Sequence, residues 1–322
     1  MMMHRIALLL GTWLCAAALP VSTALAQAAF PSQRIEIVIP LTPGSAPDIL
    51  ARLVGERLSQ RLGQPVIVSA KPGAATQLAM AYLKRAKPDG HTLLLIHSGM
   101  IATSFVYKAY TGDILKDHTF ISAISTTPYV VAVNSSLPVQ SIADLIAYSK
   151  ANPQKLNFGS TGGAYDIDAI RLQKALGIQV QIIPYPGGSQ QLASLAANET
   201  QVSIVSVRSA RPLIKNIRLL AVASPKRFTQ APELPTLDEL GIPQFYGGYW
   251  YGLIGPADMP AAVTQRLNRE INEILAEPEV LKRIEGLTNE VLRGSPADFE
   301  NLARQTYESY KKTALDAGIK PE

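Results

Sequence analysis

The chain has 322 residues and a formal net charge of +5, with 47% hydrophobic and 17% charged side chains. A chain of this length and composition can bury a sizeable core, which excludes disorder as the default state and indicates one or two globular domains. Lysine and arginine are scattered among the acidic residues instead of forming blocks, so nucleic-acid binding has little support.

The first 26 residues are typical of a secretory signal peptide. A basic start and an apolar run over residues 6–19 precede the small residues Ala24 and Ala26. The run is shorter than the ~20 residues that a membrane-spanning helix needs, so a transmembrane anchor is the weaker alternative. The sequence therefore predicts export to the periplasm and removal of residues 1–26, which contain the only cysteine, Cys15.

After this segment, short apolar runs alternate with amphipathic patterns, which is typical of an α/β protein with largely parallel sheets. The first unit is a strand at residues 35–39 and a helix that ends at Gly63, where glycine suits a left-handed cap. Further strands are predicted within residues 65–70, 91–98, 129–134, 155–160, 180–185, 201–207 and 218–224. Helices are predicted near residues 77–85, from 141, near 167–175, from 189, and within 257–277 and 295–318.

The number of strands predicts two lobes instead of one very wide sheet, because single hydrophobic cores stop growing at about 250 residues. We expect the chain to cross between the lobes near residues 124–128 and near residues 223–226. Lobe 1 then consists of residues 27–124 and 225–322, and lobe 2 consists of residues 125–224, inserted between them.

Three glycine-bearing turns join a predicted strand to a predicted helix. We call them the first elbow (residues 40–48), the second elbow (residues 157–168) and the third elbow (residues 183–191). Such turns present free backbone N–H groups at the positive end of a helix, and in open α/β sheets these ends gather where ligands bind. One elbow alone is explained as an ordinary helix cap. Three of them in an exported, two-lobed protein predict a cleft that binds an anion.

The sequence lacks the phosphate-binding, nucleophile-elbow and zinc-protease motifs of common enzymes. Beyond residue 26 the histidines are His91, His97 and His118, whose spacing predicts no metal site, and no cofactor is expected. His97 follows a predicted strand, where it either contacts a ligand or, as is commoner, has a structural role. The aromatic cluster at residues 245–253 forms either core or hinge packing, or a surface that faces the cleft.

Long segments resemble Bug-type periplasmic receptors, the solute-binding components of tripartite tricarboxylate transporters. These segments are residues 30–74, 86–99, 136–162, 183–205, 218–243 and 249–260. They follow in order and cover nearly the whole chain after residue 26. The resemblance implies the type II periplasmic binding protein fold, a two-lobed α/β Venus flytrap that traps a small carboxylate between two strand-to-helix loops.

Carried over by position, the resemblance implies a set of ligand-binding residues. In the first loop they are Thr42, Pro43, Gly44, Ser45, Ala46 and Asp48; in the second loop they are Ser160, Thr161, Gly162, Gly163, Ala164, Tyr165 and Asp166; Ser98 and Gly187 line the cleft. The family usually has Pro-Gly-Gly-Ser-Thr-Asp in the first loop, whereas residues 43–48 here read Pro-Gly-Ser-Ala-Pro-Asp.

Two charged residues bear on the ligand. Asp166 stands at a predicted helix start, where it competes with a bound carboxylate for the same N–H groups. Arg208 can compensate, because a guanidinium can hold a carboxylate through two parallel hydrogen bonds. The alternative for Arg208 is a salt bridge to Asp166 or to a surface acid.

The leading interpretation is a periplasmic receptor, not an enzyme, that closes on a small organic acid and presents it to the permease of a tripartite transporter. The acid is a mono- or dicarboxylate, aliphatic or aromatic. One alternative is a ligand-sensing receptor whose partner is a sensor protein. The other is an exported hydrolase that uses Ser160 or Ser45, against which the lack of a paired histidine weighs.

Overall fold

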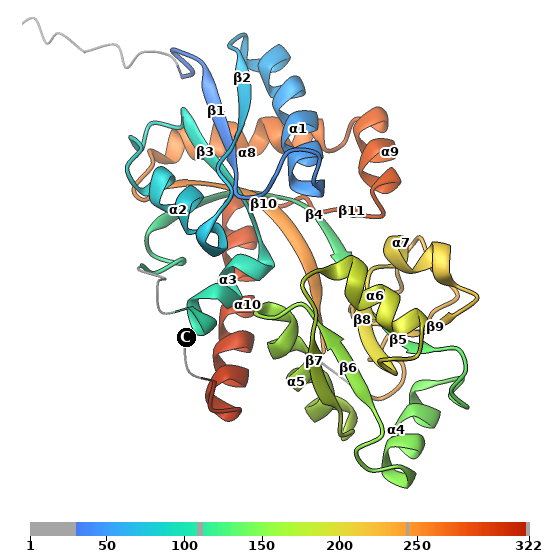
Figure 1. Ribbon diagram of the computed structural model, residues 1–322. Helices are drawn as coiled ribbons and strands as arrows, with labels where there is room; N and C mark the ends of the chain where they lie inside the picture. The colour runs from blue at the N-terminus through green and yellow to red at the C-terminus, as the bar shows by residue number, and fades with distance from the viewer. Residues whose placement is uncertain (1–29, 108–111, 243–244, 320–322) are drawn as a thin grey trace, which may run out of the picture.

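The strands form two sheets, one in each half of the molecule (Figure 1). The computed structural model describes residues 30–107, 112–242 and 245–319, so the predicted signal peptide lies outside the described residues. The sheet of lobe 1 contains β1 (Ile35–Ile39), β2 (Val66–Ala70), β3 (Thr92–His97), β4 (His118–Pro128), β10 (Gly248–Pro256) and β11 (Glu290–Val291). The sheet of lobe 2 contains β5 (Val130–Asn134), β6 (Asn157–Ser160), β7 (Gln181–Pro184), β8 (Val202–Val205) and β9 (Ile217–Val222).

Helices cover both sheets. Lobe 1 has α1 (Ala46–Leu62), η1 (Ala74–Thr76), α2 (Gln77–Lys84), α3 (Ser98–Val106), α8 (Ala261–Ile274), α9 (Pro278–Gly286) and α10 (Pro296–Asp316). Lobe 2 has α4 (Ile142–Ala151), α5 (Ala164–Leu176), α6 (Gly188–Ala196), α7 (Val207–Ala210) and η2 (Arg211–Leu213). The helices and strands that the sequence analysis expected are present, with ends that differ by a few residues.

Both sheets are mixed, so the prediction of largely parallel sheets is wrong. The strand orders are β11-β4-β10-β3-β1-β2 and β7-β6-β8-β5-β9. β1 runs parallel to β2 and β3, and β6 runs parallel to β7 and β8. β10 is antiparallel to β3 and β4, and β5 is antiparallel to β8 and β9. β4 and β10 were not predicted from the sequence; they carry the chain out of the first sheet and back into it. Since they are neighbours, they must run in opposite directions.

Two extended segments connect the lobes, and they are hydrogen-bonded to each other. Buried Tyr129 lies between the end of β4 and the start of β5, and its N–H donates to the carbonyl of Gly247 at 2.9 Å. The carbonyl of Tyr129 accepts from the N–H of Ala223 at 2.8 Å. In the chain that follows β9, Phe228 and Leu234 are buried in one cluster with Val222 of that strand. The lobe boundaries at residues 124/125 and 224/225 stay a prediction.

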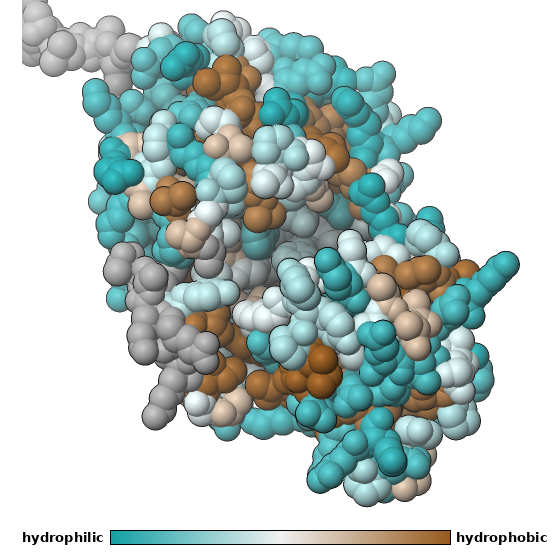
Figure 2. All heavy atoms as spheres, in the orientation of Figure 1, coloured by the Kyte–Doolittle hydropathy of each residue, from teal (hydrophilic) through white to brown (hydrophobic). Residues whose placement is uncertain are grey.

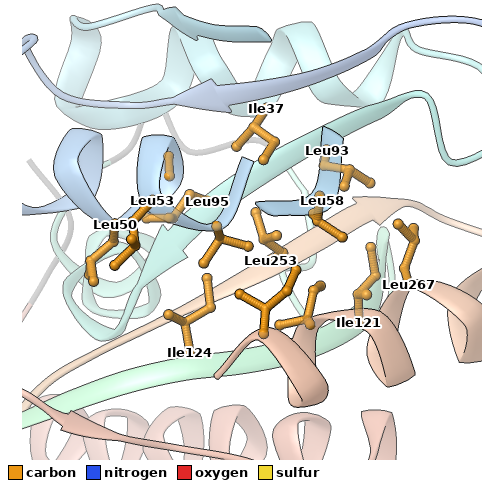
Figure 3. Packing of buried hydrophobic residues seen from close by; sticks show 14 of the residues in the cluster. Ile37, Leu50, Leu53, Leu58, Leu93, Leu95, Ile121, Ile124, Leu253 and Leu267 are labelled. Carbon is orange, nitrogen blue, oxygen red and sulfur yellow. The ribbon is translucent and has the colours of Figure 1, made fainter. Parts of the chain in front are cut away.

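The main core of lobe 1 lies between its sheet and helices α1 and α8. Figure 3 shows how the apolar face of α1 meets the strands. The cluster includes Ile37, Leu50, Leu53, Leu58, Leu93, Leu95, Ile121, Ile124, Leu253 and Leu267. Burying one such side chain contributes about 1.5–3 kcal/mol. The predicted end of α1 is confirmed, because Gly63 has φ 68° and its N–H donates to the carbonyl of Ser59.

Gly248 begins β10 at the return crossing, with φ +150°. A Cβ atom there would lie 2.4 Å from the carbonyl oxygen of Thr127 and 2.8 Å from Cα of Pro128, so the paired crossing strands would have to move apart. We expect Gly248→Ala to lower the free energy of unfolding by about 1–3 kcal/mol in urea denaturation. Gly286→Ala is the control, because no atom lies within 4 Å of its added Cβ. Equal stability of the two variants would contradict the argument.

Candidate functional site

A cavity of about 270 Å³ lies between the two lobes. In Figure 2 the outline of the molecule narrows between its two halves, on the side where α1 and α9 face α6 and α7 in Figure 1. Lobe 1 and its crossing strand contribute Ala46, Thr127, Tyr249, Tyr251, Leu287 and Asn289 to the wall. Lobe 2 contributes mainly Tyr165, Gly188, Leu192, Val205, Ser206 and Arg208. Because both lobes form the wall, a ligand in this cavity contacts both.

Four tyrosines form one continuous part of the wall, and we call Tyr129, Tyr165, Tyr249 and Tyr251 the tyrosine wall. The ring centroid of Tyr129 lies 5.5 Å from that of Tyr165 and 5.7 Å from that of Tyr249. Tyr249 stacks on Tyr251 at 6.3 Å. Burial raises the pKa of all four phenols, so they are neutral at physiological pH. This part of the cavity is aromatic and uncharged.

Arg208 is the one charged side chain among the described residues that line the cavity. It is exposed on α7, and within the described ranges it forms no ion pair with Asp166 or with any other acid. The salt bridge considered for Arg208 is therefore not formed in this structure. The cavity carries one unpaired positive charge, which suits an anion.

The first elbow uses its own acid to satisfy its backbone. The N–H of Gly44 donates to Oδ2 of Asp48 at 2.9 Å, and Nε of Arg52 donates to Oδ1 at 2.9 Å. Burial raises the pKa of Asp48, but the hydrogen bonds from Arg52 and Gly44 outweigh burial and lower this pKa. Of the first-loop residues only Ala46 lies on the cavity wall. Thr42, Pro43 and Gly44 are exposed.

The polar groups of the second elbow also form hydrogen bonds with one another. Oγ of Ser160 donates to Oδ1 of Asp166 at 2.6 Å and accepts from the N–H of Gly162 at 3.1 Å. Tyr165 lies on the cavity wall, whereas Thr161, Gly162, Gly163 and Ala164 do not line it. Gly44 and Gly162 have φ of +83° and +81°, and an added Cβ would meet no atom within 4 Å. Glycine is thus required there by backbone conformation and not by crowding.

The third elbow reaches the cavity through the start of α6. Gly188 lies on the wall, Gly187 does not, and the first turn of α6 carries no acid, unlike those of α1 and α5. The amide of Gln191 donates to Oγ of Ser203 at 2.6 Å, which fixes this helix on the sheet. Ser98 lies elsewhere, because its Oγ donates to the carbonyl of Gly248 at 2.9 Å and stabilises the crossing.

Several wall residues were missed by the sequence analysis. Tyr249 and Tyr251 belong to the aromatic cluster, whose cleft-facing alternative agrees with their place on the wall. Tyr129, Leu287 and Asn289 were not singled out, and they carry no local motif; only the position of Tyr129 at a predicted strand start was a signal.

His97 lies behind the tyrosine wall at the end of β3. Its ring centroid is 5.6 Å from that of Tyr249 and 6.3 Å from that of Tyr251. Both ring nitrogens are buried without a hydrogen-bond partner among the described residues. Burial lowers the pKa of His97 to about 4, so the imidazole is neutral at physiological pH. His97 does not line the cavity, which agrees with the structural role considered for it.

Two α/β lobes, two crossings and a cavity between the lobes define a two-lobed periplasmic binding protein, and solved structures share this fold. The structure described as R. palustris Rpa4515 with adipate matches with a TM-score of 0.75 and 29% identity, over 91% of this chain and 100% of that one. The predicted fold class is confirmed.

Similar sequences identify the family to which the chain belongs. The model of the tripartite tricarboxylate transporter family receptor matches residues 50–317. The UPF0065 protein in the tcbD-tcbE intergenic region of Pseudomonas sp. is 32% identical over 293 residues, which are 89% of this chain and 87% of that protein. Protein BugT of Bordetella pertussis is 29% identical, over 88% of each chain. The chain belongs to the tripartite tricarboxylate transporter receptor family, as its resemblance to Bug-type receptors predicted.

None of the helices described is both long and apolar enough to span a bilayer. Within the same part of the chain, no three His, Cys, Asp or Glu side chains gather as a possible metal site.

Proposed function

We propose that this chain is a periplasmic receptor that binds a small organic acid in the cavity between its lobes and presents it to a membrane permease. The observation that carries the proposal is Arg208, an unpaired guanidinium that supplies the only charge among the described residues of the cavity wall. Membership in the receptor family supports the same function, and one relative is described with adipate. The features of residues 1–26 and membership in the receptor family support export.

The binding mechanism follows from a wall that is shared between lobes. Arg208 and Gly188 come from lobe 2, while Leu287 and Asn289 come from lobe 1. A ligand contacts the wall residues of both lobes only when the lobes are closed around it. It therefore binds the closed state more tightly than the open state and shifts the protein toward closure. We place the hinge at the two hydrogen-bonded crossings, at Tyr129 and Gly247, where the chain passes between the sheets.

Sensing and catalysis are the two competing functions. Capture of the permease or of a sensor protein by the tagged receptor separates transport from signalling. For catalysis, Oγ of Ser160 donates to Asp166 and Oγ of Ser45 donates to the carbonyl of Thr42 at 2.7 Å. Neither hydroxyl is hydrogen-bonded to a described histidine, so neither has the base that a serine hydrolase needs.

The function is tested with a panel of carboxylates and their uncharged amides in thermal-shift experiments. A ligand that binds only the folded protein raises its melting temperature. We expect at least one carboxylate to raise the melting temperature and its amide to have no effect. Equal shifts with acids and amides would contradict a receptor for organic acids.

Arg208→Gln tests the residue that carries the proposal. We expect the affinity for the best carboxylate of the panel to fall by ~2 kcal/mol, roughly 30-fold, because the bound anion loses its counter-charge. Isothermal titration calorimetry measures the affinity, and the melting temperature of the free protein should not change. The matched control is Arg85→Gln, since Arg85 is an exposed cation at the end of α2 that lies outside the cavity wall. Unchanged affinity of the Arg208 variant would move the anion site away from α7.

A further inference from the structure

The walls of the cavity differ sharply in chemistry. The tyrosine wall forms one part, and the aliphatic side chains Leu192, Ile204, Val205 and Leu287 lie beside it. Tyr129 meets Tyr249 edge to face at 83°, while Tyr249 and Tyr251 are stacked at 18°. Such a surface presents both ring faces and ring edges, which are the two ways in which an aromatic ligand packs on protein aromatics.

The charged part of the wall is small. Arg208 supplies one positive charge, and two other cations close to the elbows are already paired: Arg52 with Asp48 at 2.9 Å and Arg171 with Asp168 at 2.7 Å. The side-chain amide groups of Asn289 and Gln191 donate to the hydroxyls of Ser125 and Ser203.

A second carboxylate on the ligand would therefore meet only uncharged groups, namely the phenols, the aliphatic side chains and the hydroxyls of Thr127, Ser206 and Ser209. Burying an ionised carboxylate without a counter-charge is strongly unfavourable. The cavity of about 270 Å³ is also just below the usual range for drug-sized ligands, so it suits a small molecule. One charge, one aromatic surface and a small volume together restrict the ligand.

We infer that the ligand is a small aromatic monocarboxylate, with its carboxylate at Arg208 and its ring on the tyrosine wall. This inference rests on the proposed function and narrows it, because it excludes aliphatic dicarboxylates as the preferred ligands. The ring gains contact with Tyr165, Tyr249 and the aliphatic side chains. The carboxylate keeps its charge-assisted hydrogen bonds to the guanidinium at the exposed edge of the cavity.

Calorimetry with four probes separates the inference from the proposed function. The probes are benzoate, cyclohexanecarboxylate, adipate and benzamide. We expect benzoate to bind at least tenfold more tightly than each of the other three. Tighter binding of adipate or cyclohexanecarboxylate would overturn the aromatic monocarboxylate but keep the receptor for organic acids. Equal binding of benzamide and benzoate would overturn the proposed function, and no binding of any acid would overturn both.

Variants of Tyr165 test the contribution of the ring surface. We expect Tyr165→Leu to weaken benzoate binding about tenfold and Tyr165→Phe to keep it within about threefold, because the phenyl ring and not the hydroxyl makes the contact. Tyr148→Leu is the matched control, since Tyr148 packs on the core of lobe 2 and does not line the cavity. Melting temperatures of the free variants show that each is folded. Unchanged affinity of Tyr165→Leu would overturn the placement of the ring.

Discussion

We expect Asp168→Ala to lower the free energy of unfolding by about 3–5 kcal/mol, because it leaves Arg171 with no carboxylate partner in a mostly buried position. Nη1 of Arg171 donates to Oδ1 of Asp168 at 2.7 Å, and the side chains of Arg171 and Asp168 are only 13% and 0% exposed. Burial raises the pKa of Asp168, and the guanidinium of Arg171 only partly opposes this rise. Burying the two charges therefore costs free energy, and removing only one of them costs more because the other is left buried without its partner.

The same pair connects the lobes. Asp168 and Arg171 lie on α5 of lobe 2, and the hydroxyl of Tyr310 on α10 of lobe 1 donates to Oδ2 of Asp168 at 3.3 Å. Nη2 of Arg171 donates to the carbonyl of Tyr246, just before the return crossing, at 2.9 Å. Loss of Asp168 removes a contact between α5 and α10 as well as a partner of Arg171.

Urea denaturation at neutral pH measures the loss. The control is Asp316→Ala on the same seam between α5 and α10, where exposed Asp316 pairs with Lys174 and Lys312. Exposed pairs contribute little, so this variant should lose much less stability. The double variant Asp168→Leu/Arg171→Leu should recover part of the loss, because it removes both buried charges. Similar losses for Asp168→Ala and Asp316→Ala would contradict the argument.

The regular elements could be predicted because their patterns are local. The apolar positions of α1 and its cap at Gly63 follow from spacing, and Ser295 caps α10 through Asp298 as its Ser-Pro-Ala-Asp start indicates. β4 and β10 were missed because their sequences are not plain apolar runs. β4 contains Ser122 and Ser125, which are fully buried, and the hydroxyl of Ser125 accepts a hydrogen bond from Nδ2 of Asn289, a residue far along the chain that only the fold brings near.

The candidate site could be predicted only in part. The elbows lie at strand-to-helix junctions as expected, but a sequence does not tell whether an acid in the first turn faces a ligand or its own backbone. Asp48 and Asp166 turn inward, to Gly44 and Ser160, since short acidic side chains readily bond to nearby backbone and hydroxyl groups. The tyrosine wall consists of residues from three separate segments of the chain, so no local sequence pattern predicts it.

We expect His97 by itself to lower the free energy of unfolding by about 3 kcal/mol as the pH drops from 6.5 to 4. Above pH 6.5 the imidazole is neutral in both the folded and the unfolded chain. Between pH 6.5 and 4 the His97 imidazole is protonated in the unfolded chain but stays neutral in the folded protein, so unfolding becomes more favourable. Below pH 4 both states carry the proton, and this contribution no longer changes.

The variant His97→Leu removes the titration and leaves no unpaired polar atom next to Tyr249. Its unfolding free energy, measured by urea denaturation at several pH values, should change by about 3 kcal/mol less than that of the wild type over this window. Burial also lowers the pKa of His118, which acts in the same direction, so His118→Leu is the control that separates the two histidines. The carboxylates with lowered pKa values, such as Asp48 and Asp117, lose their contribution only below their ordinary value of 3.8. Parallel pH profiles for the wild type and His97→Leu would show that His97 finds a partner for its proton in the folded protein.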